Sequence, residues 1–268
     1  MKNLQRAKKS LGQNFLIDNN IINKIIKIGN IDKNTNVMEI GSGYGNLTKA
    51  IIYNNPKKIL AVEKDKKLAF LLNERFKHCS SLKVINRDIL DIIAEKKSDK
   101  NIIVFGNLPY NISTKILSSL IMLKDWPPWY DALILMFQKE VADRILAKVK
   151  TKDFSRLTVL SNWRLEIKKH FDVSRHCFSP KPKINSTILS FKPKKNIFYN
   201  FKNPKNLEKI TRILFSNRRK MINKNLIKLF KGKKSLINEL AIDLNKRPEE
   251  LNSEIFYRIT MLYEKSFN

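Results

Sequence analysis

The segment "MEIGSGYGNLTKAI" (38–51) places three glycines, at every second position, between an apolar run and an amphipathic one. Gly41, Gly43 and Gly45 have no Cβ, so they can turn the chain tightly and let a ligand approach the backbone. The spacing G-x-G-x-G is not the G-x-G-x-x-G of dinucleotide-binding turns, and it favours an adenosyl ligand without a pyrophosphate. Because glycine turns also end ordinary strands, this segment alone predicts a strand, a turn and a helix.

The first two-thirds of the chain alternates short apolar runs with amphipathic stretches, which is typical of a parallel sheet with crossover helices. The expected strands are 36–41, 58–63, 82–86, 101–106, 131–137, 164–173 and 186–191. The expected helices between them are roughly 45–54, 66–77, 113–123 and 138–148. The proline-containing segment "FSPKPKINS" (178–186) is expected to be a loop.

The last quarter of the chain has a different pattern. From Pro204 onwards the periodicity is helical, with breaks at Gly232 and Pro248, and a linker is expected near "KPKKNIFYNFKNPKN" (192–206). We therefore predict an α/β domain over 1–195 and a small helical domain over 204–268.

Composition limits the kind of protein. At 268 residues and 43% hydrophobic content the chain can bury a sizeable core, and no apolar run approaches the ~20 residues that a spanning helix needs. The formal net charge is +29, and it is unevenly spread: 180–235 has 17 Lys and Arg against one acid, whereas 32–131 has 16 against 11. Codon drift toward lysine would spread the charge more evenly, so we favour a polyanion-binding surface on the later part of the chain.

Two cysteines, Cys79 and Cys177, are too few for a disulfide scaffold and suit a reducing cytosol. Each follows a histidine, so a mixed metal site is an alternative, but no C-x-x-C or H-x-x-x-H spacing is present and we expect no metal. The basic opening "MKNLQRAKKS" (1–10) resembles a fragment of a transit peptide, yet it is short for one, and we expect a mature cytoplasmic N-terminus.

Two acids follow the next two expected strands. Glu63 ends the second, about 20 residues after the glycine turn, where an acid commonly accepts hydrogen bonds from ribose hydroxyls. Asp88, after the third, could accept a hydrogen bond from an adenine amino group. Either acid alone could be a solvated strand end, but ligands of open α/β sheets bind along this edge, so a series of such residues favours a site.

The fourth expected strand ends in "GNLPYNIS" (106–113). An adenine amino group is a poor nucleophile, because its lone pair is delocalised into the ring. Acceptors such as the Asn107 amide oxygen and the carbonyls of Leu108 and Pro109 could hold its N–H bonds so that the lone pair is directed at a methyl donor. The ring of Tyr110 could stack on a base taken out of its helix.

The N-[LI]-P-[YF] pattern after the fourth strand resembles the signature of amino-methyltransferases that act on adenine or cytosine. Further segments resemble, in order and spacing, the KsgA/RsmA/Dim1 family of ribosomal RNA small subunit (16S) adenine N6,N6-dimethyltransferases. These segments are "SLGQNFLID" (10–18), "EIGSGYGNLT" (39–48), "GNLPYNIS" (106–113), "MFQKEVADRILA" (136–147), "FSPKPKINS" (178–186), "FSNRRKMINKNL" (215–226) and "RPEELN" (247–252).

This resemblance implies a class I, Rossmann-like methyltransferase domain with a small helical C-terminal domain. It implies S-adenosylmethionine as methyl donor and, as substrate, two adjacent adenosines in a hairpin near the 3′ end of 16S rRNA in the immature small subunit. The implied donor-site residues are Asn14, Leu16, Gly41, Gly43, Glu63, Asp88 and Asn107. Asn107, Leu108, Pro109 and Tyr110 would orient the base, and Phe178 would stack on its other side. Arg218, Arg219 and Lys220 of the C-terminal domain would contact RNA, and the protein is expected to be a monomer.

Two alternatives stay open. A large-subunit (23S) rRNA dimethyltransferase of the macrolide-resistance type shares "QNF", the glycine turn and the Asn-Pro-aromatic pattern, but "NRRKMINKNL" and "RPEELN" favour the small-subunit family. A non-catalytic RNA- or DNA-binding relative is the other, and the intact Gly41, Glu63, Asp88 and Asn107 argue against it.

Overall fold

The computed structural model describes residues 13–95 and 101–267. The chain divides into two compact units, which are described separately. The first unit contains Met1–Leu120, Pro127–Ala142 and Glu166–Pro193, and the second contains Ile121–Trp126, Asp143–Leu165 and Lys194–Asn268. The second unit thus resumes at Lys194, near the expected linker, and it also includes two earlier stretches that sequence periodicity placed in the first domain.

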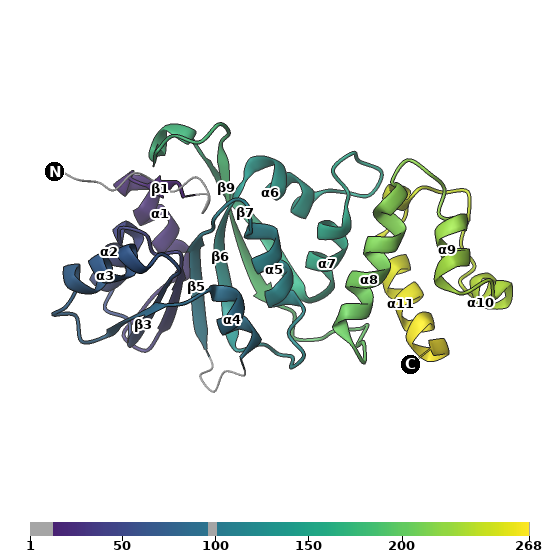
Figure 1. Ribbon diagram of the computed structural model, residues 1–268, viewed down its shortest axis with the longest axis horizontal. Helices are drawn as coiled ribbons and strands as arrows, with labels where there is room; N and C mark the ends of the chain where they lie inside the picture. Colours follow the sequence, from purple (N-terminus) through teal and green to yellow (C-terminus); the bar gives the residue numbers. More distant parts are fainter. Residues whose placement is uncertain (1–12, 96–100, 268) are drawn as a thin grey trace. The chain divides into compact units, whose positions relative to one another are not determined.

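The first unit is built on a seven-stranded sheet with the order β4-β3-β2-β5-β6-β9-β7 (Figure 1). Its strands are β2 (Asn36–Ile40), β3 (Lys58–Glu63), β4 (Leu82–Asn86), β5 (Ile102–Asn107), β6 (Tyr130–Gln138), β7 (Leu165–Val173) and β9 (Ser186–Pro193). All neighbours from β4 to β6 pair in parallel, and β9 pairs antiparallel with β6. The seven expected strands are confirmed to within two residues at each end.

The strand order changes direction at β2, which pairs with β3 on one side and with β5 on the other. Where the order reverses, the helices that follow the two strands leave on opposite faces, and a crevice opens at the carboxyl ends. The residues that follow β2, β3 and β5 therefore meet at one edge of the sheet. A short two-stranded sheet, in which β1 (Phe15–Leu16) pairs antiparallel with β8 (Phe178–Ser179), also belongs to the first unit.

Within residues 13–95 and 101–267, six helices that begin in the first unit precede or connect the strands of this sheet, and the last of them ends in residues of the second unit. They are α1 (Asn19–Gly29), α2 (Asn46–Tyr53), α3 (Lys66–Arg75), α4 (Ile89–Ala94), α5 (Ser113–Ile121) and α6 (Lys139–Leu146). Sequence periodicity did not identify α1 or α4. In α1 the β-branched isoleucines are weak helix formers, but Asp18 caps the helix by accepting hydrogen bonds from the N–H groups of Asn20 and Ile21. Isoleucines of α1 and α2 then pack on inward-facing residues of β2, β5 and β6, which form the core on that face.

The second unit is helical. It contains α7 (Arg156–Arg164), α8 (Pro204–Leu214), α9 (Asn223–Leu229), α10 (Lys234–Glu239) and α11 (Ser253–Phe267), with α8 against both α7 and α11 (Figure 1). The expected breaks lie where predicted, since Gly232 has a φ of 78° and Pro248 begins a short 3₁₀ turn. The helix α7 was not predicted. Its last residue, Arg164, is buried over the rings of Trp126 and Trp163 and donates to the carbonyls of Ile121 and Leu123.

Candidate active site

The glycine turn after β2 faces the loop that follows β5. Gly41 has a φ of 72°, and a Cβ at this position would lie 3.7 Å from the carbonyl oxygen of Asn107 and 3.9 Å from Cδ of Pro109. Gly43 has a φ of 55°, and a Cβ there would meet the Phe15 ring at 2.8 Å. The turn therefore needs glycine for its backbone conformation, and side chains would fill the space in which the turn, the 14–17 segment and the β5 loop approach one another.

Glu63 ends β3 beside this turn, with only 7% of its surface exposed. Its two carboxylate oxygens accept hydrogen bonds of 2.9 Å from the N–H groups of Gly43 and Asp65. Burial raises the pKa of Glu63, and these backbone hydrogen bonds oppose the rise. Each oxygen keeps a second lone pair, so the carboxylate is held rigidly and can still accept hydrogen bonds from a ligand.

Asp88 follows β4 and caps α4, where one carboxylate oxygen accepts the Leu90 N–H at 2.9 Å. The other oxygen pairs with Lys64 Nζ at 2.8 Å. Partial burial acts to raise the pKa of Asp88, but the hydrogen bond and charge of Lys64 outweigh it, so the pKa lies below its ordinary value. The side chain is ionised at neutral pH and can accept a donor from a ligand.

Asn107 is the last residue of β5, and its amide orientation is set by the N-terminal segment. Its Nδ2 donates to the carbonyl of Asn14 at 2.7 Å. Two residues further on, the carbonyl of Leu16 accepts a hydrogen bond of 2.9 Å from Nδ2 of Asn46, the first residue of α2. Because the Asn107 amide nitrogen is engaged in this way, its Oδ1 is the atom left to act as an acceptor.

The opposite edge of the same segment pairs with β8. Phe15 lies opposite Ser179, Leu16 lies opposite Phe178, and the Ile17 N–H donates to the Cys177 carbonyl at 2.9 Å. In an extended segment alternate backbone groups point to opposite edges. Backbone groups on one edge of the segment therefore bond to β8. The carbonyls on the other edge accept hydrogen bonds from the carboxamides of Asn46 and Asn107.

The loop after β5 carries the remaining predicted groups. The carbonyl of Pro109 accepts the Ile112 N–H at 3.1 Å, and the side chain of Leu108 is buried. Tyr110 is half-buried, and its hydroxyl lies 2.8 Å from Oγ of Ser186. Burial raises the pKa of Tyr110, with the hydrogen bond to Ser186 opposing it, so the hydroxyl is protonated at neutral pH.

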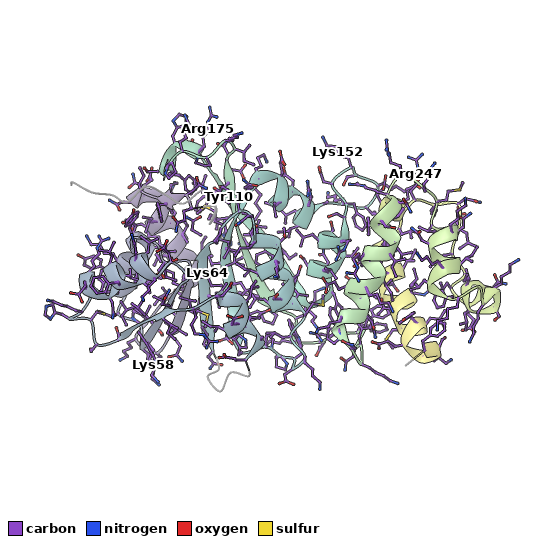
Figure 2. The ribbon with its side chains drawn as sticks, viewed as in Figure 1. Lys58, Lys64, Tyr110, Lys152, Arg175 and Arg247 are labelled. Carbon is purple, nitrogen blue, oxygen red and sulfur yellow. The ribbon has the colours of Figure 1, made fainter. Side chains whose placement is uncertain are left out.

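Most of the predicted donor- and base-site residues line one pocket within the first unit. They are Asn14, Gly41, Gly43, Glu63, Asp88, Asn107, Leu108, Pro109 and Tyr110. Figure 2 labels Lys64 and Tyr110, two of the residues that line this pocket. A glycine turn, a buried carboxylate after β3 and an ionised carboxylate after β4 fit an adenosyl group with a positively charged sulfonium, because ribose hydroxyls and the adenine amino group all donate hydrogen bonds.

Leu16 and Phe178 lie elsewhere. Leu16 is 5% exposed and lines a smaller adjoining pocket, together with Glu39, Asn46 and Asn107. Phe178 is 3% exposed, packs in the core with residues of α1 and α2, and is not among the residues that line the larger pocket. A stacking role for Phe178 therefore stays a prediction that this burial does not support.

The three cationic residues predicted to contact RNA belong to the second unit and differ from one another. Arg218 is partly buried, its Nε lies 3.2 Å from Glu249, and its guanidinium donates to the Thr151 carbonyl. It therefore connects the "NRRK" segment (217–220) to the "RPEE" segment (247–250) within that unit. Arg219 and Lys220 are exposed. Their side chains are the better placed to meet a polyanion.

Three residues that contribute to the site were not predicted. Asn46 donates to the carbonyl of Leu16 in the segment whose Asn14 carbonyl engages Asn107, and Ser186 contacts Tyr110; both lie within the motifs quoted from the sequence. Glu39 is the third: it is 1% exposed and accepts a hydrogen bond of 2.6 Å from the Thr48 hydroxyl. Burial raises its pKa to about 8. A carboxylate in the middle of an apolar strand was the available signal for Glu39.

The described residues contain no group of three His, Cys, Asp or Glu side chains that could bind a metal ion. In the same part of the chain no helix is long and apolar enough to cross a bilayer. Cys79 and Cys177 are free thiols, in contact with Ser81 and Asp18 respectively.

The strand order, the glycine turn and the acids at the next two strand ends define a class I methyltransferase, a Rossmann-like fold that uses S-adenosylmethionine. The Asn-Leu-Pro-Tyr loop at the fourth of these strand ends narrows the class to enzymes that methylate amino groups. The chain belongs to the ribosomal RNA adenine dimethylase family, which it matches over residues 4–265.

Known relatives agree with this membership. The chain is 49% identical to the ribosomal RNA small subunit methyltransferase A of Pelagibacter ubique, over 97% of each chain, and 39% identical to that of Wolbachia pipientis wMel, over 95% of this chain and 88% of the relative. The crystal structure of a dimethyladenosine transferase from Plasmodium falciparum superposes with a TM-score of 0.76 at 27% identity, over 94% of this chain and 98% of that one. The 23S rRNA methyltransferase ErmE, 22% identical over 93% of this chain and 99% of its own, has the same fold with a TM-score of 0.66.

Proposed function

We propose that this enzyme transfers methyl groups from S-adenosylmethionine to N6 of two adjacent adenosines in the 3′-terminal hairpin of 16S rRNA, two to each. It would act as a cytoplasmic monomer on the immature small subunit. The observation that carries the proposal is the Asn107 amide, held by the Asn14 carbonyl at the carboxyl end of β5, in one pocket with Glu63, Asp88 and Tyr110.

The donor would bind along the strand ends. Bound S-adenosylmethionine supplies an electrophilic methyl group on its sulfonium. Glu63, already fixed by two backbone N–H groups, would accept from ribose hydroxyls, and Asp88 would accept from the adenine amino group of the donor. Gly41, Gly43 and the Asn14–Leu16 segment would leave room for the donor beside Asn107.

The acceptor amine would be held by two oxygens. Asn107 Oδ1 is one, because the amide nitrogen is engaged by Asn14. We take the Leu108 carbonyl as the second acceptor, because the Pro109 carbonyl already accepts the Ile112 N–H and has only one lone pair left. Together they would hold the two N–H bonds out of the ring plane, so that the nitrogen lone pair is no longer delocalised and is directed at the methyl group without a general base. The new N–C bond would form as the methyl–sulfur bond breaks, S-adenosylhomocysteine would leave, and the cationic nitrogen would then lose one N–H proton to solvent.

The target base would be stacked on the ring of Tyr110. In an RNA duplex an adenine amino group is not accessible to an enzyme pocket, so the base must leave its stack, and an aromatic face compensates for part of that cost. Phe178 was expected on the other side of the base, but it is buried and is not among the residues that line this pocket.

Specificity for the small subunit rests on the named relatives. Both curated relatives described above are named small-subunit methyltransferases, and this chain covers 97% and 88% of their lengths. The likeness to ErmE is one of fold alone. On the second unit, Arg219 and Lys220 would contact rRNA phosphates, and Arg218 would hold them in place through Glu249.

The test offers the purified protein small-subunit and large-subunit precursor particles with labelled methyl donor. We expect label in small-subunit RNA, recovered as N6,N6-dimethyladenosine. Label confined to large-subunit RNA would overturn the proposed substrate and favour the macrolide-resistance type of activity.

A further inference from the structure

The hydroxyl of Tyr110 has a specific partner that the chemistry above does not use. It lies 2.8 Å from Oγ of Ser186, the first residue of β9. Ser186 is completely buried and lies opposite Gln138 at the end of the β6–β9 pair. The neighbouring Asn185 carbonyl accepts the Lys139 N–H at 3.0 Å, and its side chain accepts the Arg175 N–H at 3.0 Å. The serine is thus fixed in the sheet.

Tyr110 itself stands on a loop, where its position is not set by strand pairing. Its carbonyl accepts a hydrogen bond of 3.3 Å from the hydroxyl of Ser113, which is also buried. One serine therefore holds the backbone end of the residue and the other holds the far end of the ring. The hydroxyl oxygen lies on the axis about which the ring turns, so this bond restricts χ1 and fixes the position of the ring, while packing around the half-buried ring restricts its plane.

We propose that Ser186 is a positioning residue for methyl transfer, which fixes the ring of Tyr110 as a preformed platform for the target base. The inference rests on the proposed function, because it takes adenine as the acceptor. The inference also predicts which of the two successive methyl transfers to one adenosine depends more on this ring. Unmodified N6 has two N–H bonds for Asn107 and Leu108, but after one transfer it has one, so the second transfer depends more on the stacking ring.

The main experiment compares wild type with Ser186→Ala on small-subunit RNA under saturating donor and RNA. We expect kcat to fall about tenfold, with the RNA dissociation constant and the KM for the donor unchanged within about twofold. Monomethyladenosine should accumulate, because the second transfer slows more than the first. Unchanged kcat with an unchanged ratio of mono- to dimethyladenosine would overturn the proposal.

The chain supplies a matched control. Ser190 lies four residues along the same strand and therefore faces the same side, and its Oγ is also 2.8 Å from a side chain, Nε2 of His170. His170 is not among the residues that line the pocket. Ser190→Ala should keep kcat within about twofold of wild type, and an equal loss in both variants would show a general effect on β9 and overturn a specific role.

The variant Tyr110→Phe tests the same bond from the other side without altering the strand. It keeps the ring and removes the hydroxyl, so it should reproduce the product ratio of Ser186→Ala, and the double variant should lose no more than either single one. Independent, multiplied losses would contradict the inference, as would a normal product ratio in Tyr110→Phe. If wild type does not methylate adenosine at all, the proposed function fails instead, so the two failures are distinguishable.

Discussion

At the scale of single residues, the site depends on side chains whose orientation is fixed before any substrate arrives. Asn107 illustrates this, because the Asn14 carbonyl engages its amide nitrogen and leaves the oxygen as an acceptor for the amine in the role we propose. A preorganised acceptor of this kind contributes to the transition state without a cost of reorganisation at the moment of reaction.

Asn107→Ala should therefore lower methyl transfer by roughly 10²–10³-fold, the effect of removing one preorganised polar group from a transition state. RNA affinity should stay within about twofold, because phosphate contacts dominate it. Single-turnover transfer and filter binding measure the two quantities. Dimethyladenosine formation at the wild-type rate in this variant would refute the role of Asn107.

Glu39 gives a prediction about pH. Its buried carboxyl has a pKa of about 8 in the folded state, against 4.5 as its ordinary value. Between these pH values the folded state holds a proton that the unfolded state has lost, so the stability contributed by Glu39 falls as pH rises through this window.

Glu39→Gln removes this titration and keeps an oxygen for the Thr48 hydroxyl. We expect the variant to gain stability relative to wild type as pH rises from 5 to 8, by about 1–3 kcal/mol at the upper end. Urea unfolding at a series of pH values measures the difference, and a difference that is constant with pH would contradict a protonated Glu39.

How far a sequence predicts such a site depends on what holds each residue. Gly41, Glu63, Asp88 and Asn107 lie at strand ends, so predicting the strands was enough to predict that these residues lie close together at one pocket. Asn46 and Ser186 act through contacts over 30 and 76 positions in sequence. Local patterns carry no information about such contacts, and for the same reason the burial of Phe178 against α1 was not foreseen.

At the scale of elements, the parallel strands could be predicted because each is an apolar run bounded by turn residues. The helices α4 and α7 could not, since their form depends on caps and on burial rather than on periodicity. In α1 the buried residues Ile22, Ile25 and Ile26 do recur at helical spacing, so the sequence held a signal for this helix that was missed. In α7, Arg164 appears polar in the sequence but is buried against two tryptophans. The short strands β1 and β8 are two residues each and exist only because they pair with each other.

The 14–17 segment yields a prediction at this scale. Asn46→Ala removes the hydrogen bond to the Leu16 carbonyl and should loosen one edge of the segment that orients Asn107. We expect kcat to fall by about three- to tenfold, with a higher KM for the donor.

Asn54→Ala, at the C-cap of the same helix, is its control, because it also removes a side-chain bond to a carbonyl, of 2.8 Å to Ala50, and Asn54 does not line the pocket. Steady-state kinetics of both variants should separate them. Equal activity in the two would show that Asn46 does not act on the site.

At the scale of the whole molecule, positive charge is concentrated in the later part of the chain. Lys220, Lys224 and Lys228 recur at every fourth position in the second unit and are all exposed, and the last two lie on α9. Like charges one helical turn apart repel each other, so this spacing lowers the stability of the helix unless an anion lies alongside. Codon drift explains the abundance of lysine better than it explains this arrangement.

Replacing these three lysines with glutamine should weaken RNA binding and lower the slope of log affinity against log salt by about two units. Lys33, Lys57 and Lys58 provide a control with the same charge change, since they are exposed at the amino ends of the strands, and Figure 2 shows Lys58 at the lower edge of the first unit, away from Tyr110. Binding isotherms at several salt concentrations compare the two triple variants. Equal losses of RNA affinity in the two triple variants would indicate that only the total charge of the protein, and not its position, affects binding.

The most direct test of the whole account is mass spectrometry of nucleosides from unmethylated small-subunit RNA after incubation with the protein and S-adenosylmethionine. The account predicts N6,N6-dimethyladenosine at two adjacent positions of the 3′-terminal hairpin in the wild-type reaction, and almost none with Asn107→Ala. Absence of dimethyladenosine from the wild-type reaction, or its undiminished formation by the variant, would contradict it.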